Sequence, residues 1–452
     1  MHLYRPAVVS PEDLVLTARP AIAEIAPEVN SPILTWSDGP VGPTIEAHSG
    51  QRARILLRNE LNEPTIAHWH GLRPPEEADG HPRFAVGTGG TYAYDFLIDE
   101  RAGLYWYHPH PHMRTAPQTY FGLAGLIIVR DDNEAALALP SGEREIALVL
   151  QDKRRDASGR LVYNPVGHDM MEGFLSGEAF VNGVLSPTVE VDSALYRLRI
   201  LGAGNARIFR IGLSNGAPLV LIGSDGGLLE EAVELPYVDV ATGERVDLLV
   251  DLSGLAAGSS VFLRSLAFPS PSGGMGMGRG RGMMGMGGST LPQGATMDVM
   301  EFRVADTVRE DVRLPATLTP LPRLSASSAE RRRIFRFDSM MMSHTINGRS
   351  FEMDRIDERV PFGATEVWSF VNDSRFPHPV HMHAVHFQVL ERRGGRGRVL
   401  PWERGWKDTV LLLPGEQVDV IATFDRFRGL YLMHCHNLEH EDMGMMINFL
   451  IE

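Results

Sequence analysis

The stretch that decides the fold lies near the C-terminus: Gly429-Leu430-Tyr431-Leu432-Met433-His434-Cys435-His436-Asn437-Leu438-Glu439-His440-Glu441-Asp442-Met443-Gly444-Met445. Its first residues are apolar and favour extended structure, so we predict a strand over residues 430–436. Side chains on a strand alternate between its two faces. His434 and His436 should therefore point to one side of this strand, and Cys435 to the other.

Cys435 is the only cysteine in the 452 residues, so no disulfide within the chain can claim it. A free cysteine is more often a small apolar core residue than a metal ligand. The residues that follow favour a ligand, because His440 and Met445 come five and ten positions later. A thiolate, imidazoles and a weak axial Met are the soft ligand set of a blue copper centre. One strand would then serve two metal sites, one on each face.

Histidines spaced two residues apart are in excess over chance. Random placement of the 17 histidines gives about 0.6 pairs with the period of a strand. The sequence has five such pairs: His68/His70, His108/His110, His110/His112, His381/His383 and His434/His436. Four separate pairs supply eight imidazoles, more than any single zinc site uses. We therefore expect a cluster of several metal ions between the first and last thirds of the chain.

The composition predicts an all-β fold. The 46 Gly and 30 Pro supply turns between many short Val, Ile and Leu runs, and pairs of alternating strands recur near residues 42–59, 180–201 and 344–372. Repeats of this length predict three β-sandwiches. We place these domains at residues 1–135, 136–310 and 325–452, with linkers near 131–143 and 306–330.

The segment 269–290 breaks this pattern, because it is a low-complexity run of Gly and Met. So many glycines cannot pack a core, and we expect an insertion that leaves the second domain. Two interpretations of its methionines stay open, namely binding of Cu(I) through soft thioethers or an adaptable apolar flap. The residues concerned are Met275, Met277, Met283, Met284 and Met286.

The net charge and the hydropathy of the chain exclude some classes of binding partner and some cellular locations. The net charge of −14 argues against nucleic acid, which requires a basic face, and no apolar run is long enough for a membrane helix. The start, Met1 to Pro6, has the features of neither a signal peptide nor a targeting helix. The protein is then either cytoplasmic or exported by a leader that has been removed.

Four segments carry a resemblance to a known family: HWHGL (68–72), WYHPHPH (106–112), HPVHMHAVHF (378–387) and HCHNLEHEDMGMM (434–446). In order and spacing they resemble the four copper-binding motifs of the multicopper oxidases. The bacterial three-domain group of laccases and copper-efflux oxidases is the nearest match. The resemblance implies three cupredoxin-like Greek-key β-sandwich domains and four coppers per chain, and we expect a monomer with a periplasmic or extracellular location.

The resemblance also implies a role for individual residues. Type 1 copper would take His378, Cys435, His440 and an axial Met445; type 2 copper would take His68 and His381; the type 3 pair would take His70, His108, His110, His383, His434 and His436. His112 and His386 fall outside this scheme. Asp79 and Glu441 match positions at which the family supplies protons for the reduction of O2 to water, which carboxylates can do.

The electron donor is less well defined. A laccase would oxidise phenols or aromatic amines, whereas a cuprous oxidase would oxidise Cu(I). The Met/Gly segment and Met340-Met341-Met342 favour the second activity. Copper-efflux oxidases, however, place Asp and Met four and two residues before the equivalent of His378, where this chain has Ser374 and Phe376. We therefore expect a laccase-like enzyme of broad specificity, with a cuprous or metal oxidase in copper tolerance as the alternative.

A copper-free cell-division scaffold, a copper-storage protein and a nitrite reductase are the alternatives from other classes. The intact motifs around Cys435 argue against the scaffold. Neither storage nor nitrite reduction requires a cluster of eight histidines. The sequence therefore predicts an oxidase.

Overall fold

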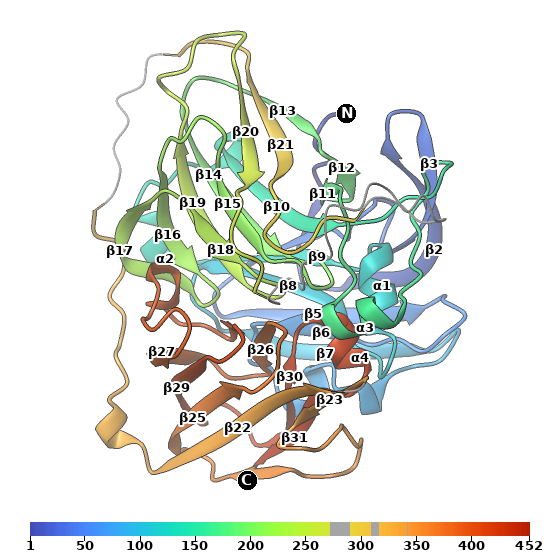
Figure 1. Cartoon of the computed structure of the whole chain (residues 1–452), viewed down its shortest axis with the longest axis vertical. Coiled ribbons are helices and arrows are strands. Elements are labelled where there is room, and N and C mark those ends of the chain that lie inside the picture. Colours follow the sequence, from blue (N-terminus) through green and yellow to red (C-terminus); the bar gives the residue numbers. More distant parts are fainter. Residues whose placement is uncertain (272–289, 309–315, 341) are drawn as a thin grey trace.

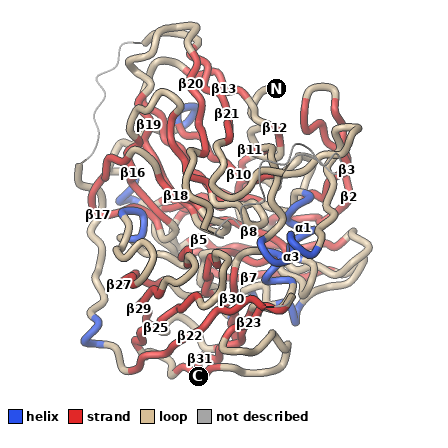
Figure 2. Tube along the Cα trace, viewed as in Figure 1, coloured by secondary structure: helices blue, strands red, loops and turns tan. Residues whose placement is uncertain are grey.

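The computed structural model describes residues 1–271, 290–308, 316–340 and 342–452. Strands dominate the chain, and its helices are short (Figure 2). The predicted all-β class is confirmed, and no helix within these ranges has the length and apolarity needed to span a membrane. The five methionines of the Met/Gly segment, as well as Met341, lie outside the described residues. The α-helices of the described part are α1 (Thr115–Phe121), α2 (Asp132–Ala135), α3 (Gly167–Glu172) and α4 (Leu438–Asp442).

The strands form six sheets, which group along the chain into three pairs. The first sheet pair lies between residues 8 and 130. One of its sheets has the order β1 (Val8–Val9), β4 (Thr44–His48), β9 (Gly125–Arg130), β8 (Gly103–Pro109) and β6 (Ala67–His70); the other has the order β3 (Val29–Thr35), β2 (Leu14–Ala26), β5 (Gln51–Asn59) and β7 (Thr91–Ile98). Ala53, Ile55 and Leu57 alternate with more exposed residues, so one face of β5 enters the core.

The second sheet pair lies between residues 145 and 304. Its larger sheet has the order β12 (Val184–Leu185), β11 (Ala179–Val181), β10 (Glu145–Asp152), β14 (Leu195–Gly202), β19 (Arg245–Asp251), β16 (Leu219–Ser224) and β17 (Gly227–Leu235). Its smaller sheet has the order β13 (Thr188–Val191), β21 (Met297–Val304), β20 (Ser260–Ser265), β15 (Phe209–Leu213) and β18 (Val238–Val240). Most of β14 and β19 is buried, because the sheet is covered on both faces.

The third sheet pair lies between residues 331 and 451. One sheet has the order β23 (Ser343–Ile346), β22 (Arg331–Met340), β25 (Thr365–Asn372), β29 (Gln417–Thr423) and β27 (Phe387–Arg393); the other has the order β24 (Glu358–Val360), β31 (Met446–Ile451), β30 (Gly429–Cys435), β26 (His378–Met382) and β28 (Thr409–Leu412). Figure 1 shows this pair, in orange and red, as the lower part of the molecule. The three sheet pairs agree with three sandwiches, while the exact domain limits stay a prediction.

Strand pairing brings the histidine motifs to the boundary between the first and third sheet pairs. In the antiparallel pair β6 and β8, His68 lies opposite His108. In the antiparallel pair β26 and β30, His381 lies opposite His434. The strand predicted over residues 430–436 is β30, which ends one residue earlier because Asn437 then caps α4. The figure places β26, β30, β6 and α4 together at the centre of the molecule (Figure 1).

Candidate metal centre

Cys435 shares a buried pocket with two histidines of the third sheet pair. Its Sγ lies 3.3 Å from His378 Nδ1 and 3.5 Å from His440 Nδ1, and these two nitrogens lie 3.2 Å apart. One sulfur and two nitrogens in a triangle are the in-plane set of a blue copper centre. Met445 is buried in the same core, and its carbonyl accepts a bond of 3.0 Å from Cys435 N. The structure therefore brings together the four residues expected at type 1 copper.

Local folding and hydrogen bonds orient the two rings beside Cys435. Asn is among the residues preferred at helix N-caps, and the side chain of Asn437 caps α4 by accepting from His440 N. This helix carries His440. His440 Nε2–H donates to the carbonyl of Met171 in α3 at 2.9 Å, so its Nδ1 keeps a free lone pair. The outer nitrogen of His378, Nε2, lies 2.7 Å from Ser374 Oγ. Both rings thus direct Nδ1 toward the sulfur.

The eight histidines of the four pairs meet between the first and third sheet pairs, and all are buried. Pairs of nitrogens face each other at short range: His68 Nε2 lies 3.3 Å from His381 Nε2, and His383 Nε2 lies 3.1 Å from His434 Nε2. His108 Nε2 is buried without a hydrogen-bond partner among the described residues. Buried nitrogens at such distances require either shared protons or shared cations. A set of imidazoles suits copper as the cation.

Hydrogen bonds from the outer nitrogens fix the protons of most of these rings on the far side from the cluster. The Nδ1–H groups of His68, His108 and His381 donate to the backbone carbonyls of Asp79, Pro109 and Asp408, at 2.6, 2.9 and 2.9 Å. Such anchors set the tautomer and leave Nε2 as the ligand atom.

His70 is reversed with respect to these rings. Its Nε2–H lies 3.0 Å from Asp408 Oδ1, and its Nδ1 lies 3.2 Å from His436 Nε2 within the cluster. Thr409 Oγ1 also lies 3.0 Å from this Nε2, so Asp408 and Thr409 together hold that side of the His70 ring away from the cluster. Burial opposes ionisation of Asp408, but Arg245 outweighs it and holds the pKa of this carboxyl well below its usual range.

Burial also shifts the ligand groups toward their neutral forms. It lowers the pKa of His108 and of His378 to about 3. Neutral imidazole is the form that binds metals. Burial raises the pKa of the Cys435 thiol far above its ordinary value, so a thiolate at this position requires a cation beside it. The residues present thus fit a soft metal ion such as copper.

The two candidate proton donors contact different histidines of the cluster. Asp79 Oδ2 accepts a bond of 2.8 Å from His383 Nδ1, and Asp79 Oδ1 has no partner among the described residues. Glu441 Oε2 lies 3.2 Å from His434 Nδ1 and its Oε1 lies 3.6 Å from His110 Nε2. Burial raises the pKa of Asp79 well above its ordinary value. Burial acts the same way on Glu441, but the neighbouring imidazoles outweigh it and lower its pKa.

The remaining histidines lie apart from the cluster or behind it. His112 is exposed, and His386 Nε2–H donates to the carbonyl of Gly71 at 2.7 Å. Asp408 and Arg245 were not predicted from the sequence, because nothing in their spacing links them to a histidine pair. The same holds for His344, whose ring stacks on His440 at 4.0 Å between centroids. A lone His on a strand gives no such signal.

A cavity of about 420 Å³ is lined by Glu439 and Gly444, the residues that precede His440 and Met445, although none of the candidate ligands lines it. Residues of all three sheet-pair regions line it, including Pro117 of α1, Met170 of α3, and Phe351. Tyr163 Oη donates to Glu439 Oε1 at 2.9 Å at its edge, and burial raises the pKa of Glu439 to about 7. Its volume is that of a small-molecule site.

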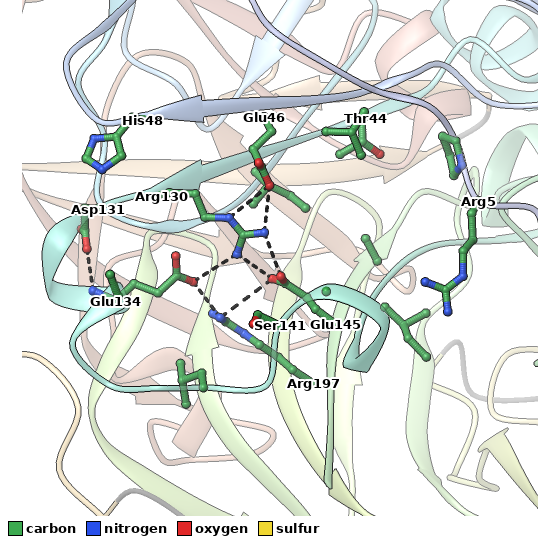
Figure 3. Close-up of a pocket in the computed structure, with 18 of the residues that line it drawn as sticks. Arg5, Thr44, Glu46, His48, Arg130, Asp131, Glu134, Ser141, Glu145 and Arg197 are labelled. Carbon is green, nitrogen blue, oxygen red and sulfur yellow. Dashed lines mark hydrogen bonds and ion pairs between the residues drawn. The ribbon is translucent and has the colours of Figure 1, made fainter. Parts of the chain in front are cut away.

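A larger cavity, of about 710 Å³, lies where the first and second sheet pairs meet. None of the candidate ligands lines it. Figure 3 shows two of its arginines in a paired network: Arg130 contacts Glu46 and Glu145, and Arg197 contacts Glu134. This network joins the two sheet pairs.

A soft thiolate group next to a cluster of eight buried imidazoles defines a copper protein of the oxidase class. Sequence models described as multicopper oxidase match residues 19–134 and 320–452. A laccase of Bacillus subtilis is 30% identical over 90% of this chain and 87% of its own length. The chain belongs to the multicopper oxidase family, which makes it an oxidase and a copper enzyme.

Two further relatives are similar to this chain over nearly its whole length. The crystal structure of the McoA multicopper oxidase from the hyperthermophile Aquifex aeolicus superposes with a TM-score of 0.89 and 33% identity, covering 100% of this chain and 99% of that one. Its likeness confirms the predicted cupredoxin sandwiches. The cell division protein FtsP of Dickeya dadantii is 30% identical over 96% of this chain and 88% of its own length.

Proposed function

We propose that the protein is a laccase-like multicopper oxidase. It would take single electrons from phenolic or aromatic amine donors and use four of them to reduce O2 to water. The observation that carries this proposal is the position of Cys435 between His434 and His436 on the end of β30. Cys435 Sγ faces His378 and His440, while His434 Nε2 faces His383.

The residues divide into the sets implied by the motifs. His378, Cys435, His440 and Met445 would hold type 1 copper, His68 and His381 type 2 copper, and His70, His108, His110, His383, His434 and His436 the type 3 pair. Bound copper would supply the one-electron acceptor at the first set and the reduction of O2 at the other two. The short covalent link from Cys435 to both neighbouring histidines supports electron transfer between the sets.

The reduction of O2 also consumes protons, which neutral imidazoles cannot supply. Asp79 and Glu441 are the groups proposed to provide them. Each is buried and each reaches histidines of both the first and third sheet pairs: Asp79 lies near His68 and His383, and Glu441 near His110 and His434. These contacts allow each carboxylate to deliver protons at different histidines of the cluster.

Two features support an organic donor. The smaller cavity is lined by Tyr163, Phe351 and Glu439, the residue before His440, and its volume of about 420 Å³ admits a small aromatic molecule. Ser374 occupies the position of the copper-efflux Asp, and its Oγ is engaged with His378 Nε2. It therefore offers no carboxylate for a second copper.

The cuprous oxidase activity stays a second candidate, since Met170 and Met171 belong to α3, whose Met171 carbonyl contacts His440. Met340 is 60% exposed and follows Ser339, which contacts His344, the residue whose ring stacks on His440. The sequence similarity to the cell division protein FtsP leaves a scaffold role as a further alternative. The complete ligand set favours the enzyme over both that role and copper storage. A monomer and a periplasmic or extracellular location stay predictions, and a cytoplasmic one stays open.

Oxygen uptake by the copper-loaded protein tests this proposal, with a phenolic donor and Cu(I) assayed in parallel and copper content measured alongside. Four coppers per chain with faster uptake from the phenol support a laccase. Faster uptake from Cu(I) instead identifies a cuprous oxidase. Full copper loading with no uptake from either donor overturns the enzymatic function and favours a scaffold or a storage protein.

A further inference from the structure

The second sheet pair contributes no candidate ligand, yet one of its side chains reaches the centre of the molecule. Arg245, the first residue of β19, is fully buried. Its guanidinium pairs with both oxygens of Asp408, with Nη1–Oδ1 and Nη2–Oδ2 distances of 2.6 Å each. Two parallel bonds of this kind fix a carboxylate in position and orientation.

The same guanidinium also donates to three backbone carbonyls, one in the first sheet pair and two in the second. Arg245 Nε donates to Leu104 of β8 at 3.0 Å, Nη1 to Gly243 at 3.0 Å, and Nη2 to Asp225 at 2.9 Å. Together with Asp408, these partners come from all three sheet pairs. Arg245 thus has all of its donors occupied and cannot turn away from Asp408 without losing several buried bonds.

Two glycines make room for this arrangement. A Cβ on Gly71 would lie 2.5 Å from Arg245 Nη2 and 2.8 Å from Asp408 Oδ2. A Cβ on Gly243 would lie 3.1 Å from His70 Cε1 and 3.0 Å from His436 Cδ2. The turn before β19 therefore packs directly on two rings of the cluster, and the second sheet pair forms one of its walls.

We propose that Arg245 is a positioning residue of the histidine cluster, which acts through Asp408 to make His70 offer Nδ1 in place of Nε2. The inference rests on the proposed role of His70 as a copper ligand. Asp408 is the charged link in this route: its Oδ1 lies 3.0 Å from Nε2 of His70, and its backbone carbonyl accepts from His381 Nδ1. Thr409 Oγ1 lies at the same distance from Nε2 of His70 and itself donates to Asp408 Oδ1. The second sheet pair would in this way control copper binding without supplying a ligand.

The test compares Arg245→Met with Arg392→Met in the copper-loaded full chain. Arg392 is a matched control, because it is fully buried and pairs with Glu403 and Glu416 without touching a histidine of the cluster. We expect Arg245→Met to weaken copper binding at the cluster by about tenfold to a hundredfold, as loss of an outer partner of a metal ligand does. The type 2 paramagnetic resonance signal should change, and the blue absorption of the Cys435 group should stay.

Arg392→Met should lose thermal stability and keep both signals. Arg245→Lys and Asp408→Asn carry the test if Arg245→Met does not fold, and both should alter the type 2 signal. The double variant Arg245→Met/Asp408→Asn should lose no more affinity than Asp408→Asn alone, since Arg245 acts through Asp408. Additive losses, or wild-type copper content and signals in all Arg245 variants, overturn the inference. A wild-type protein without blue absorption would instead refute the proposed function itself.

Discussion

The Cys435 group and the eight-histidine cluster share a strand but are built in different ways. His378, Cys435, His440 and Met445 all belong to the third sheet pair, and three of them lie within eleven residues of one another. The cluster takes histidines from the first and third sheet pairs and a wall from the second. One site therefore depends on local folding around β30 and α4, and the other on the assembly of the whole chain.

The largest expected effect is that of Cys435→Ser, which should destroy the Cys435 group and leave the eight-histidine cluster intact. Replacing the thiol in Cys435→Ser removes the only soft anionic ligand. We expect the blue colour and donor oxidation to be abolished, with one copper lost per chain and the type 2 signal kept. Visible absorption, copper content and oxygen uptake measure these outcomes. His112→Ala, an exposed control, should behave as wild type, and a blue Cys435→Ser variant would contradict the ligand assignment.

The next comparison concerns proton supply on the two sides of the cluster. Asp79→Asn and Glu441→Gln should each lower oxygen turnover by about a hundredfold to ten-thousandfold, the range that a positioned proton donor contributes. Both variants should keep the blue absorption, since neither side chain contacts Cys435. Turnover close to wild type in a fully copper-loaded variant would refute the role of that carboxylate.

Copper removal tests how far the cluster holds the sheet pairs together. A ligand that binds only the folded state at a thousandfold excess over its Kd adds about 4 kcal/mol to the free energy of unfolding. Chelation of all copper should therefore lower the melting temperature more than Cys435→Ser does, because that variant keeps the cluster. Calorimetry of the loaded, chelated and variant proteins decides this. Equal melting temperatures for the chelated and variant proteins would contradict it.

The sequence predicted the parts of both sites that follow from periodicity. Two histidines spaced two apart on a strand must share a face, and Cys435 must take the other face, so the side of the strand to which each of these side chains points was predictable. Their assignment to individual coppers comes from the family resemblance and stays a prediction. Asp408 and Arg245 were not, because their contact joins positions 163 residues apart in the chain. The contact of His440 with α3 could not be predicted either, because it uses the backbone carbonyl of Met171, and a backbone contact has no sequence signature.

The smallest expected effect concerns the outer contact of the Cys435 group. Ser374→Ala removes the hydroxyl that lies 2.7 Å from His378 Nε2 and leaves that nitrogen buried without this partner. The same hydroxyl also contacts Asn372 Oδ1 and accepts from Phe376 N. We therefore expect a loss of about 1–3 kcal/mol in the free energy of unfolding of the copper-free protein, the cost of leaving buried polar groups unpaired. The blue band should shift while the type 2 signal stays, because the hydrogen-bond partners of the His378 ring, namely Ser374, Cys435 and His440, are not residues of the eight-histidine cluster. Ser328→Ala, at an exposed serine, is the matched control for denaturant unfolding. A change in the type 2 signal of Ser374→Ala would show that the two sites are coupled through more than the strand they share.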